Sequence, residues 1–179
     1  MTDLDYSILY WIQDNIVCDA LTPIMKFFTV TGYGSLWTAV IILLLLFKKT
    51  RPIGVCAAIA IIAATACNHF LLKPLFVRPR PFVGVDISLL TSPPGGSSFP
   101  SGHATSSFAA ATAIFLQDKR YGTAALIVAA LVAFSRLYFF VHFPSDVLCG
   151  ALAGIFWAII VTLLFRYTKK KLSSTSGRP

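Results

Sequence analysis

Five long apolar runs, separated by short polar loops, constrain the fold of this chain more than any other feature of its sequence. Runs of roughly 17–25 apolar residues are long enough to cross a bilayer as helices. Hydrophobic residues make up 56% of the chain and charged residues 12%, about half the charged share of a soluble domain. We therefore predict an all-α, polytopic membrane helix bundle. The expected transmembrane helices cover residues 27–47, 53–72, 101–116, 121–139 and 145–165.

The two ends of the chain differ from these runs. Residues 4–17 are amphipathic at helical spacing but too short and too polar to span, so they predict a helix that lies in the membrane interface. Residues 169–179 are basic and rich in Ser, and they predict a disordered tail after a single membrane domain of residues 1–168. In the last apolar run, Gly150 and Gly154 lie four residues apart and predict a close helix–helix contact.

The distribution of charge predicts how the helices are oriented. Ten of the 15 Lys and Arg residues lie in the loop after the first run, the loop after the third run and the C-terminal part, whereas six of the seven acidic residues lie elsewhere. Because short cytoplasmic loops are enriched in Lys and Arg, we expect the C-terminus in the cytoplasm and the N-terminus outside. The net charge of +8 then reflects membrane topology, and we expect no nucleic-acid partner.

The same orientation brings three polar clusters to the outer membrane surface. The first begins residues 73–100, which their Pro and Gly residues predict to be a loop. The second begins the third apolar run, and the third lies around the turn between the fourth and fifth runs. Ionisable residues at the ends of membrane helices suggest a functional site. The clusters contain Lys73, Arg78 and Arg80; Ser101, Gly102 and His103; and Arg136, His142 and Asp146.

The basic and small residues of these clusters predict a phosphate site. Ser101 and Gly102 begin a helix, whose first N–H groups and dipole favour an anion. For Ser101 and Gly102 the alternative is an ordinary capped helix. For the basic residues the alternative is side chains that reach lipid headgroups. Neither alternative explains why several polar clusters lie on the same side of the membrane. For Arg78 the spacing allows either a further ligand or a solvent-facing residue, and we favour the latter. The phosphate oxygens are expected to be bound by Lys73, Arg80 and Arg136.

The histidines of these clusters predict the chemistry. His142 and Asp146 are four residues apart and share one face of a helix. A carboxylate that orients one imidazole nitrogen makes the other a better nucleophile, and His103 is placed to donate a proton to the leaving oxygen. Metal-dependent hydrolysis needs several carboxylates, yet the chain has no Glu, so we expect neither a metal nor another cofactor. His69 is expected to be an ordinary core residue.

These clusters resemble the three-part signature of the type 2 phosphatidic acid phosphatase (PAP2) superfamily. The resemblance covers residues 73–146 and agrees in order, residue type and spacing. It implies a metal-independent lipid phosphatase in which His142 is the nucleophile, Asp146 its orienting partner and His103 the general acid. The phosphate-binding residues that it implies are Lys73, Arg80, Ser101, Gly102 and Arg136.

The short, membrane-embedded form of the chain is similar to bacterial undecaprenyl diphosphate and phosphatidylglycerophosphate phosphatases. We therefore expect an enzyme of the bacterial cytoplasmic membrane that hydrolyses undecaprenyl diphosphate on the extracytoplasmic side. Phosphatidylglycerophosphate, phosphatidic acid and diacylglycerol pyrophosphate are alternative substrates. A lipid phosphotransferase and a lipid or anion transporter are alternatives of other classes. Residues 82–99, which combine apolar side chains with Pro and Gly, are expected to rest on the membrane and to gate lipid entry.

Overall fold

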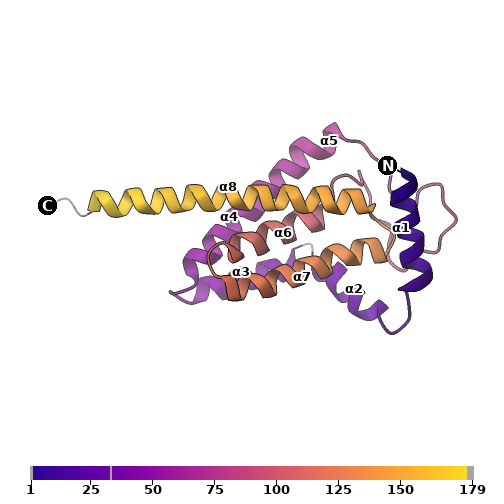
Figure 1. Ribbon diagram of the computed structural model, residues 1–179, viewed down its shortest axis with the longest axis horizontal. Coiled ribbons are helices and arrows are strands. Elements are labelled where there is room, and N and C mark those ends of the chain that lie inside the picture. Colours follow the sequence, from indigo (N-terminus) through magenta and orange to yellow (C-terminus); the bar gives the residue numbers. More distant parts are fainter. Residues whose placement is uncertain (1, 33, 177–179) are drawn as a thin grey trace.

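All the regular structure in the residues that the computed structural model describes, 2–32 and 34–176, is helical (Figure 1). The predicted all-α class is therefore confirmed. In chain order the elements are α1 (Thr2–Asn15), α2 (Thr22–Thr31), α3 (Ser35–Leu46), α4 (Arg51–Cys67), a π-helical turn η1 (Asn68–Leu72), α5 (Lys73–Leu75), α6 (Gly102–Phe115), α7 (Lys119–Tyr138) and α8 (Pro144–Ser176).

Local sequence signals set several helix ends. Helices α2 and α4 carry Pro in their first turn, where the missing N–H group costs no hydrogen bond. Asp118 caps α7, because its carboxylate accepts a hydrogen bond from the backbone N–H of Tyr121 (3.1 Å). The turn from α6 to α7 is tight enough that a Cβ at Gly122 would lie 2.0 Å from the Cα of Phe115.

Three segments are long and apolar enough to cross a membrane: Arg51–Leu75, Lys119–Tyr138 and Pro144–Lys171. The pair α2 and α3, bent by more than 40° at its break, would count together as a fourth. The expected third span forms α6, whose 14 residues rise only about 21 Å against a hydrocarbon core of about 30 Å. Three of the five expected spans, or four with the bent pair, are thus long and apolar enough to cross a membrane, whereas α6 is too short, so the expected number of five is not confirmed.

Helix α6 is the centre of the bundle. It packs against α4, α7 and α8, which surround it in the ribbon (Figure 1). Ten of its 14 residues are buried, and most are Ala, Ser or Thr, which let neighbouring backbones approach closely. The outer helices instead expose large apolar side chains, as expected for a surface in contact with lipid. Examples are Ile42, Leu46, Ile62, Ile127, Leu152 and Leu163.

The contact between α6 and α8 depends on the two predicted glycines. A Cβ on Gly150 would lie 2.6 Å from the carbonyl oxygen of Ser101, and one on Gly154 would lie 2.4 Å from that of Thr105. The backbone N–H of Ser101 also donates to the carbonyl of Asp146 (3.0 Å). The predicted small-residue contact is thus present, and it fixes the first turn of α6 beside the first turn of α8.

The chain ends are both helical in the described residues. α1 crosses the end of the bundle at which α8 begins (Figure 1). It buries Leu9 and Ile12 and exposes Leu4 and Trp11, as an interfacial helix would. α8 continues through Ser176, so residues 169–176 are helical where disorder was expected, and the rest of the expected tail lies outside the described residues.

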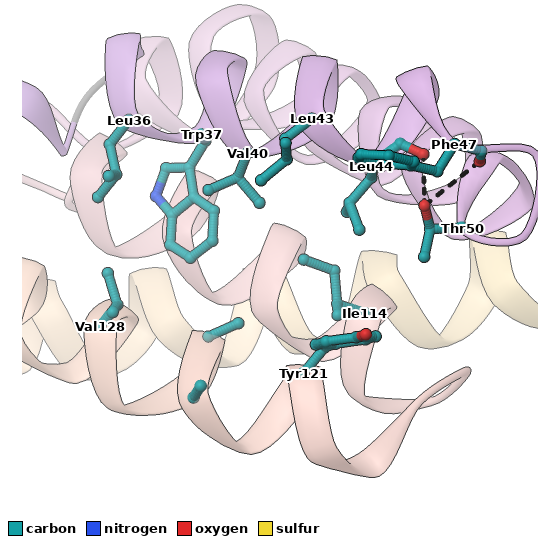
Figure 2. A pocket seen from close by; sticks show the side chains of 12 residues that line it. Leu36, Trp37, Val40, Leu43, Leu44, Phe47, Thr50, Ile114, Tyr121 and Val128 are labelled. Atoms are coloured by element: carbon teal, nitrogen blue, oxygen red, sulfur yellow. Dashed lines mark hydrogen bonds between the residues drawn. The ribbon is translucent and has the colours of Figure 1, made fainter.

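An apolar groove of about 400 Å³ lies between α3, α6 and α7 (Figure 2). Trp37 and Leu44 of α3 point into it from one side, and Ile114 of α6 and Val128 of α7 line the other. The indole N–H of Trp37 donates to the hydroxyl of Ser107 (2.8 Å), which joins the groove wall to α6. None of the residues of the three polar clusters lines this groove, so it is not the candidate active site.

Replacement of Gly150 by Ala should weaken the contact between α6 and α8. The added methyl group would meet the backbone of Ser101, which cannot rotate away, and such overpacking costs about 1–3 kcal/mol. We expect a lower melting temperature in detergent for Gly150→Ala. The matched control is Gly34→Ala, because a Cβ at Gly34 meets nothing within 4 Å. Equal melting temperatures for the two variants would contradict the close contact.

Candidate active site

The structure brings all eight predicted site residues to one end of the bundle, near α1 (Figure 1). They come from six separate segments, which meet because α6 and α8 begin, and η1 and α7 end, at this end of the bundle. Lys73 follows η1, Arg80 lies in the long segment between α5 and α6, and Ser101, Gly102 and His103 begin α6. Arg136 lies in the last turn of α7, His142 in the following turn, and Asp146 in the first turn of α8.

The turn between α7 and α8 holds His142 in a fixed place. Its Phe140 has a backbone φ of 56°, in the left-handed region that a bulky side chain adopts at a cost of about 1–3 kcal/mol. Phe139, Phe140 and Phe143 are all buried and offset this strain by packing against the neighbouring helices. Strained backbone of this kind is found at sites whose geometry must be held.

His142 is almost fully buried, and its two ring nitrogens have different neighbours. Nδ1 lies 3.6 Å from Oδ2 of Asp146 and 3.4 Å from the hydroxyl of Ser98. Nε2 lies 3.3 Å from an N–H group of Arg80, which has no lone pair to offer. This arrangement favours the tautomer with its proton on Nδ1 and a lone pair on Nε2. The second nitrogen is then available to attack an electrophile.

Asp146 is fully buried, and both of its carboxylate oxygens are occupied. Oδ2 accepts hydrogen bonds from the hydroxyl of Ser98 (2.5 Å) and the backbone N–H of Phe143 (2.9 Å). Oδ1 accepts one from a guanidinium N–H of Arg78 (2.6 Å). These bonds fix the plane of the carboxylate beside the His142 imidazole, as an orienting residue requires.

Three cations surround this pair without a carboxylate partner of their own. Arg80 is 6% exposed, and its N–H groups meet only neutral acceptors among the described residues: the carbonyl oxygens of Gly95, Gly96 and Val141, and Nε2 of His142. Arg136 is also 6% exposed and donates to the hydroxyl of Thr29. Lys73 lies close enough to Arg80, Arg136 and Asp146 for their charges to act on it. Within the described residues, none of these three cations forms a salt bridge, so the site carries excess positive charge.

Two buried polar atoms in the site have no hydrogen-bond partner among the described residues: Oγ of Ser101 and Nε of Arg136. Ser101 occupies the N-cap position of α6, but its hydroxyl does not cap the helix. A buried group without a partner costs about 1–3 kcal/mol, and an arriving anion with several oxygens would recover that cost. The helix N-terminus behind Ser101 adds partial positive charge to the same place.

His103, in the first turn of α6, lies near the same cations. Its Nε2 donates to the backbone carbonyl of Thr29 (3.1 Å), and it is close enough to His142, Arg80 and Arg136 for their charges to act on it. The structure therefore brings both histidines close to Arg80 and Arg136.

Sequence reasoning missed three residues of this site and was wrong about two others. Thr29 and Ser98 carried no signal, because single hydroxyl residues are common in membrane helices and loops. Arg78, which we expected to face solvent, instead contacts Asp146 and Asp5. His69, expected in the core, is exposed and stacks edge-on against Phe70. The third missed residue is Asp5, whose place on a predicted surface helix gave no reason to connect it with the site.

The described residues contain no group of three or more His, Cys, Asp or Glu side chains that would suit a metal ion. The acidic side chains nearest the site, Asp5 and Asp146, are already bonded to Arg78. The donor set is thus basic and hydroxylic, which suits an oxyanion better than a divalent cation.

Comparison with known proteins shows which family the chain belongs to. The family model of the PAP2 superfamily matches residues 53–170, about two thirds of the chain. The chain belongs to the PAP2 superfamily. All three signature clusters fall inside the matched range, whereas α1, α2 and α3 lie before it.

Curated PAP2 relatives resemble most of the chain. It is 37% identical over 136 residues to an undecaprenyl-diphosphatase of Sulfolobus acidocaldarius, covering 75% of this chain and 66% of that protein. It is 33% identical over 151 residues to the undecaprenyl-diphosphatase BcrC of Bacillus subtilis, covering 83% and 75%. The chain thus spans between about two thirds and three quarters of the length of these relatives.

Two solved structures share the PAP2 fold. The crystal structure of LpxE from Aquifex aeolicus superposes with a TM-score of 0.75 at 29% identity, covering 88% of this chain and 94% of that one. The phosphatidylglycerolphosphate phosphatase of Bacillus subtilis superposes with a TM-score of 0.74 at 25% identity, covering 95% and 86%. Both likenesses cover a larger share of the chain than the family model does.

The environment of His142 predicts how stability depends on pH. Burial lowers the pKa of His142 to about 4 from an ordinary value of 6.5, and the charges of Arg136 and Arg80 act in the same direction against Asp146. Because the unfolded chain binds the extra proton more readily, this stability is complete above pH 6.5 and is lost as the pH falls toward 4. The difference amounts to about 3 kcal/mol.

We expect the melting temperature in detergent to fall between pH 6.5 and pH 4, and to fall less in His142→Gln, which cannot take up the proton. The measurement is a series of thermal unfolding curves at closely spaced pH values for the two proteins. Parallel curves for wild type and variant would show that His142 is not held neutral by its surroundings.

Proposed function

We propose that the protein is a membrane lipid phosphatase that hydrolyses undecaprenyl diphosphate to undecaprenyl phosphate. The observation that carries this proposal is the set of three cations beside the His142–Asp146 pair, of which Arg80 and Arg136 are buried and Lys73 is half-buried, and none of which has a salt-bridge partner among the described residues. Buried charge of one sign is costly, and a phosphate group would compensate it. Membership of the PAP2 superfamily and similarity to two undecaprenyl-diphosphatases support the lipid diphosphate as substrate.

The geometry supports hydrolysis in two steps. In the first, Nε2 of His142 attacks the terminal phosphorus, a P–N bond forms, and the bond to the leaving oxygen breaks as His103 donates a proton to it. Asp146 stabilises the positive charge that develops on the His142 ring. In the second, His103 takes a proton from water, whose oxygen attacks the phosphorus as the P–N bond breaks, which releases inorganic phosphate and restores neutral His142.

The remaining site residues hold the phosphate oxygens during both steps. The basic side chains compensate the charge that develops on these oxygens, and they are held in place before the substrate arrives. The Ser101 hydroxyl and the first backbone N–H groups of α6 complete the set. These phosphate-binding residues are Lys73, Arg80, Ser101, Gly102 and Arg136. No step in this scheme needs a metal.

The proposed placement in the membrane follows from the charges of the loops. The single domain of residues 1–168 would cross the cytoplasmic membrane five times, with α6 shielded at its centre and α1 in the interface. Basic loops and the C-terminus would face the cytoplasm, and the site would open on the extracytoplasmic side. There the segment 82–99, with exposed Val83 and Leu90, would rest on the membrane and admit the lipid headgroup.

Replacement of the proposed nucleophile tests this function directly. We expect wild-type protein in excess EDTA to release phosphate from undecaprenyl diphosphate faster than from phosphatidylglycerophosphate, phosphatidic acid or diacylglycerol pyrophosphate. We expect His142→Ala to lose activity by on the order of 10³-fold or more, because no phosphoenzyme can form. The measurement is phosphate release from each purified lipid in mixed micelles.

The control variant for this assay is His69→Ala, since His69 is exposed on η1 and its ring packs against Phe70. It should retain wild-type turnover. Near-normal turnover by His142→Ala would refute the nucleophile, and turnover that appears only with added divalent ions would refute the metal-independent mechanism.

The role of His103 predicts a dependence on the leaving group. An alkoxide needs a proton as it leaves, whereas a nitrophenolate does not, so loss of a general acid should matter only for the former. We expect His103→Asn to slow hydrolysis of an alkyl phosphate by about 10²- to 10⁴-fold and that of nitrophenyl phosphate far less. Equal losses on the two substrates, measured as kcat for each, would argue against proton donation by His103.

A further inference from the structure

A second carboxylate is connected to the site through Arg78. The guanidinium of Arg78 donates to Oδ1 of Asp146 (2.6 Å) and, through its other terminal nitrogen, to Oδ2 of Asp5 (2.8 Å). Its Cζ atom lies 4.0 Å from the ring centre of Phe143, which adds a cation–π contact. Arg78 thus joins α1 to the first turn of α8 by a planar fork with two carboxylate partners.

Asp5 is buried, although it lies on a helix whose neighbouring residues face outward. It is 5% exposed, and its oxygens accept hydrogen bonds from the backbone N–H of Ser145 (3.0 Å) and from the Ser145 hydroxyl (2.7 Å). Burial opposes ionisation of Asp5, but the bonds from Arg78 and Ser145 outweigh it and lower its pKa, so the carboxylate is charged at neutral pH. It therefore caps α8 from another helix while it holds Arg78.

A surface role does not explain this arrangement. An exposed salt bridge is worth about 0–1 kcal/mol and needs no burial of either partner. Here the network buries two carboxylates, Asp5 and Asp146, and shares one guanidinium between them. The same network ends on the carboxylate that lies beside the His142 imidazole.

We propose that Asp5 and Arg78 are positioning residues for the reaction: Asp5 holds Arg78 so that its guanidinium fixes the plane and the charge of the Asp146 carboxylate, which in turn orients His142. This inference rests on the proposed function, because it concerns the Asp146 carboxylate that orients His142, the proposed nucleophile. Neither residue touches the phosphate, which is bound from the opposite side by the basic residues named above.

Loss of Asp5 should change turnover more than binding. Without it, the positive charge of Arg78 would act on Asp146 alone, and its guanidinium would keep the Ser145 hydroxyl but lose one of its two carboxylate partners. Asp146 would then stabilise the developing imidazolium less well. We expect Asp5→Asn to lower kcat by about 10- to 100-fold with little change in KM, since a small misplacement of a reacting group is enough for such losses. Asp5→Glu should recover part of the activity.

The matched control is Asp3→Asn, which removes an exposed carboxylate from the same helix turn. It should leave kcat at the wild-type value. A double-mutant cycle adds a test of coupling: if both residues act through Asp146, Asp5→Asn and Arg78→Gln together should cost scarcely more than the more damaging single change. Independent effects would instead multiply.

A second measurement reports on the positioning without turnover. The chain contains three histidines, so ¹⁵N-histidine spectra of the full-length protein in detergent are simple, and His142→Gln identifies the His142 signals. We expect a single His142 tautomer, protonated on Nδ1, in wild type and in Asp3→Asn. In Asp5→Asn we expect a mixture of tautomers, because the Asp146 carboxylate is no longer held.

The outcomes separate this proposal from the proposed function. If wild-type protein released no phosphate from any lipid, the proposed function would fail, while the tautomer measurement would still test the network. The positioning role is overturned if Asp5→Asn keeps the wild-type kcat. It is also overturned if kcat falls while the His142 spectrum stays unchanged, which would indicate a merely structural cap on α8.

Discussion

The close contact between the first turns of α6 and α8 is the constraint on which the site depends. Gly150 lets the backbone of Ser101 approach α8, and the hydrogen bond from Ser101 to the carbonyl of Asp146 fixes the register of the two helices. One side of this junction carries His103 and the anion-binding helix start, and the other carries the His142–Asp146 pair. A displacement of either helix would separate His142, the proposed nucleophile, from the proposed phosphate-binding residues at the start of α6, so the same backbone contacts serve the packing and the proposed chemistry.

Electrostatics explains why the site selects an anion and holds it. Arg80 and Arg136 are buried with hydrogen bonds to neutral oxygens, which fix their positions without neutralising their charge. The only guanidinium near the site that does meet carboxylates, among the described residues, is that of Arg78. The positive charges of Arg80 and Arg136 are therefore not neutralised where the phosphate would bind. The charge of Arg78 is balanced by carboxylates, and it keeps Asp146 ionised. A divalent cation would face repulsion beside Arg80 and Arg136, and beside Arg78 it would find its carboxylate ligands already bonded.

Much of this could be predicted from the sequence, because membrane helices leave a simple pattern. The apolar runs located the helices. The charges of the loops predicted which loops lie on the same side of the membrane, and therefore that the three polar clusters would meet at one end of the bundle. What could not be predicted are the contacts between residues distant in the chain. Thr29 holds both His103 and Arg136, but a Thr on an apolar helix has no periodicity to mark it. Arg78 looked dispensable because its partner Asp5 lies 73 residues away, and only the packing of α1 across the bundle brings the two together.

The N-terminal helices show how the family site is completed from outside the signature. The matched family region begins at residue 53, so neither Asp5 on α1 nor Thr29 on α2 belongs to it. Each nevertheless bonds a charged residue of the site, Asp5 through Arg78 and Thr29 through Arg136. α1 presents Asp5, Leu9 and Ile12 inward at helical spacing, while Leu4, Ile8 and Trp11 face outward. Displacement of α1 from the end of the bundle would pull Asp5 from the network, so the orientation of the Asp146 carboxylate depends on how α1 packs there.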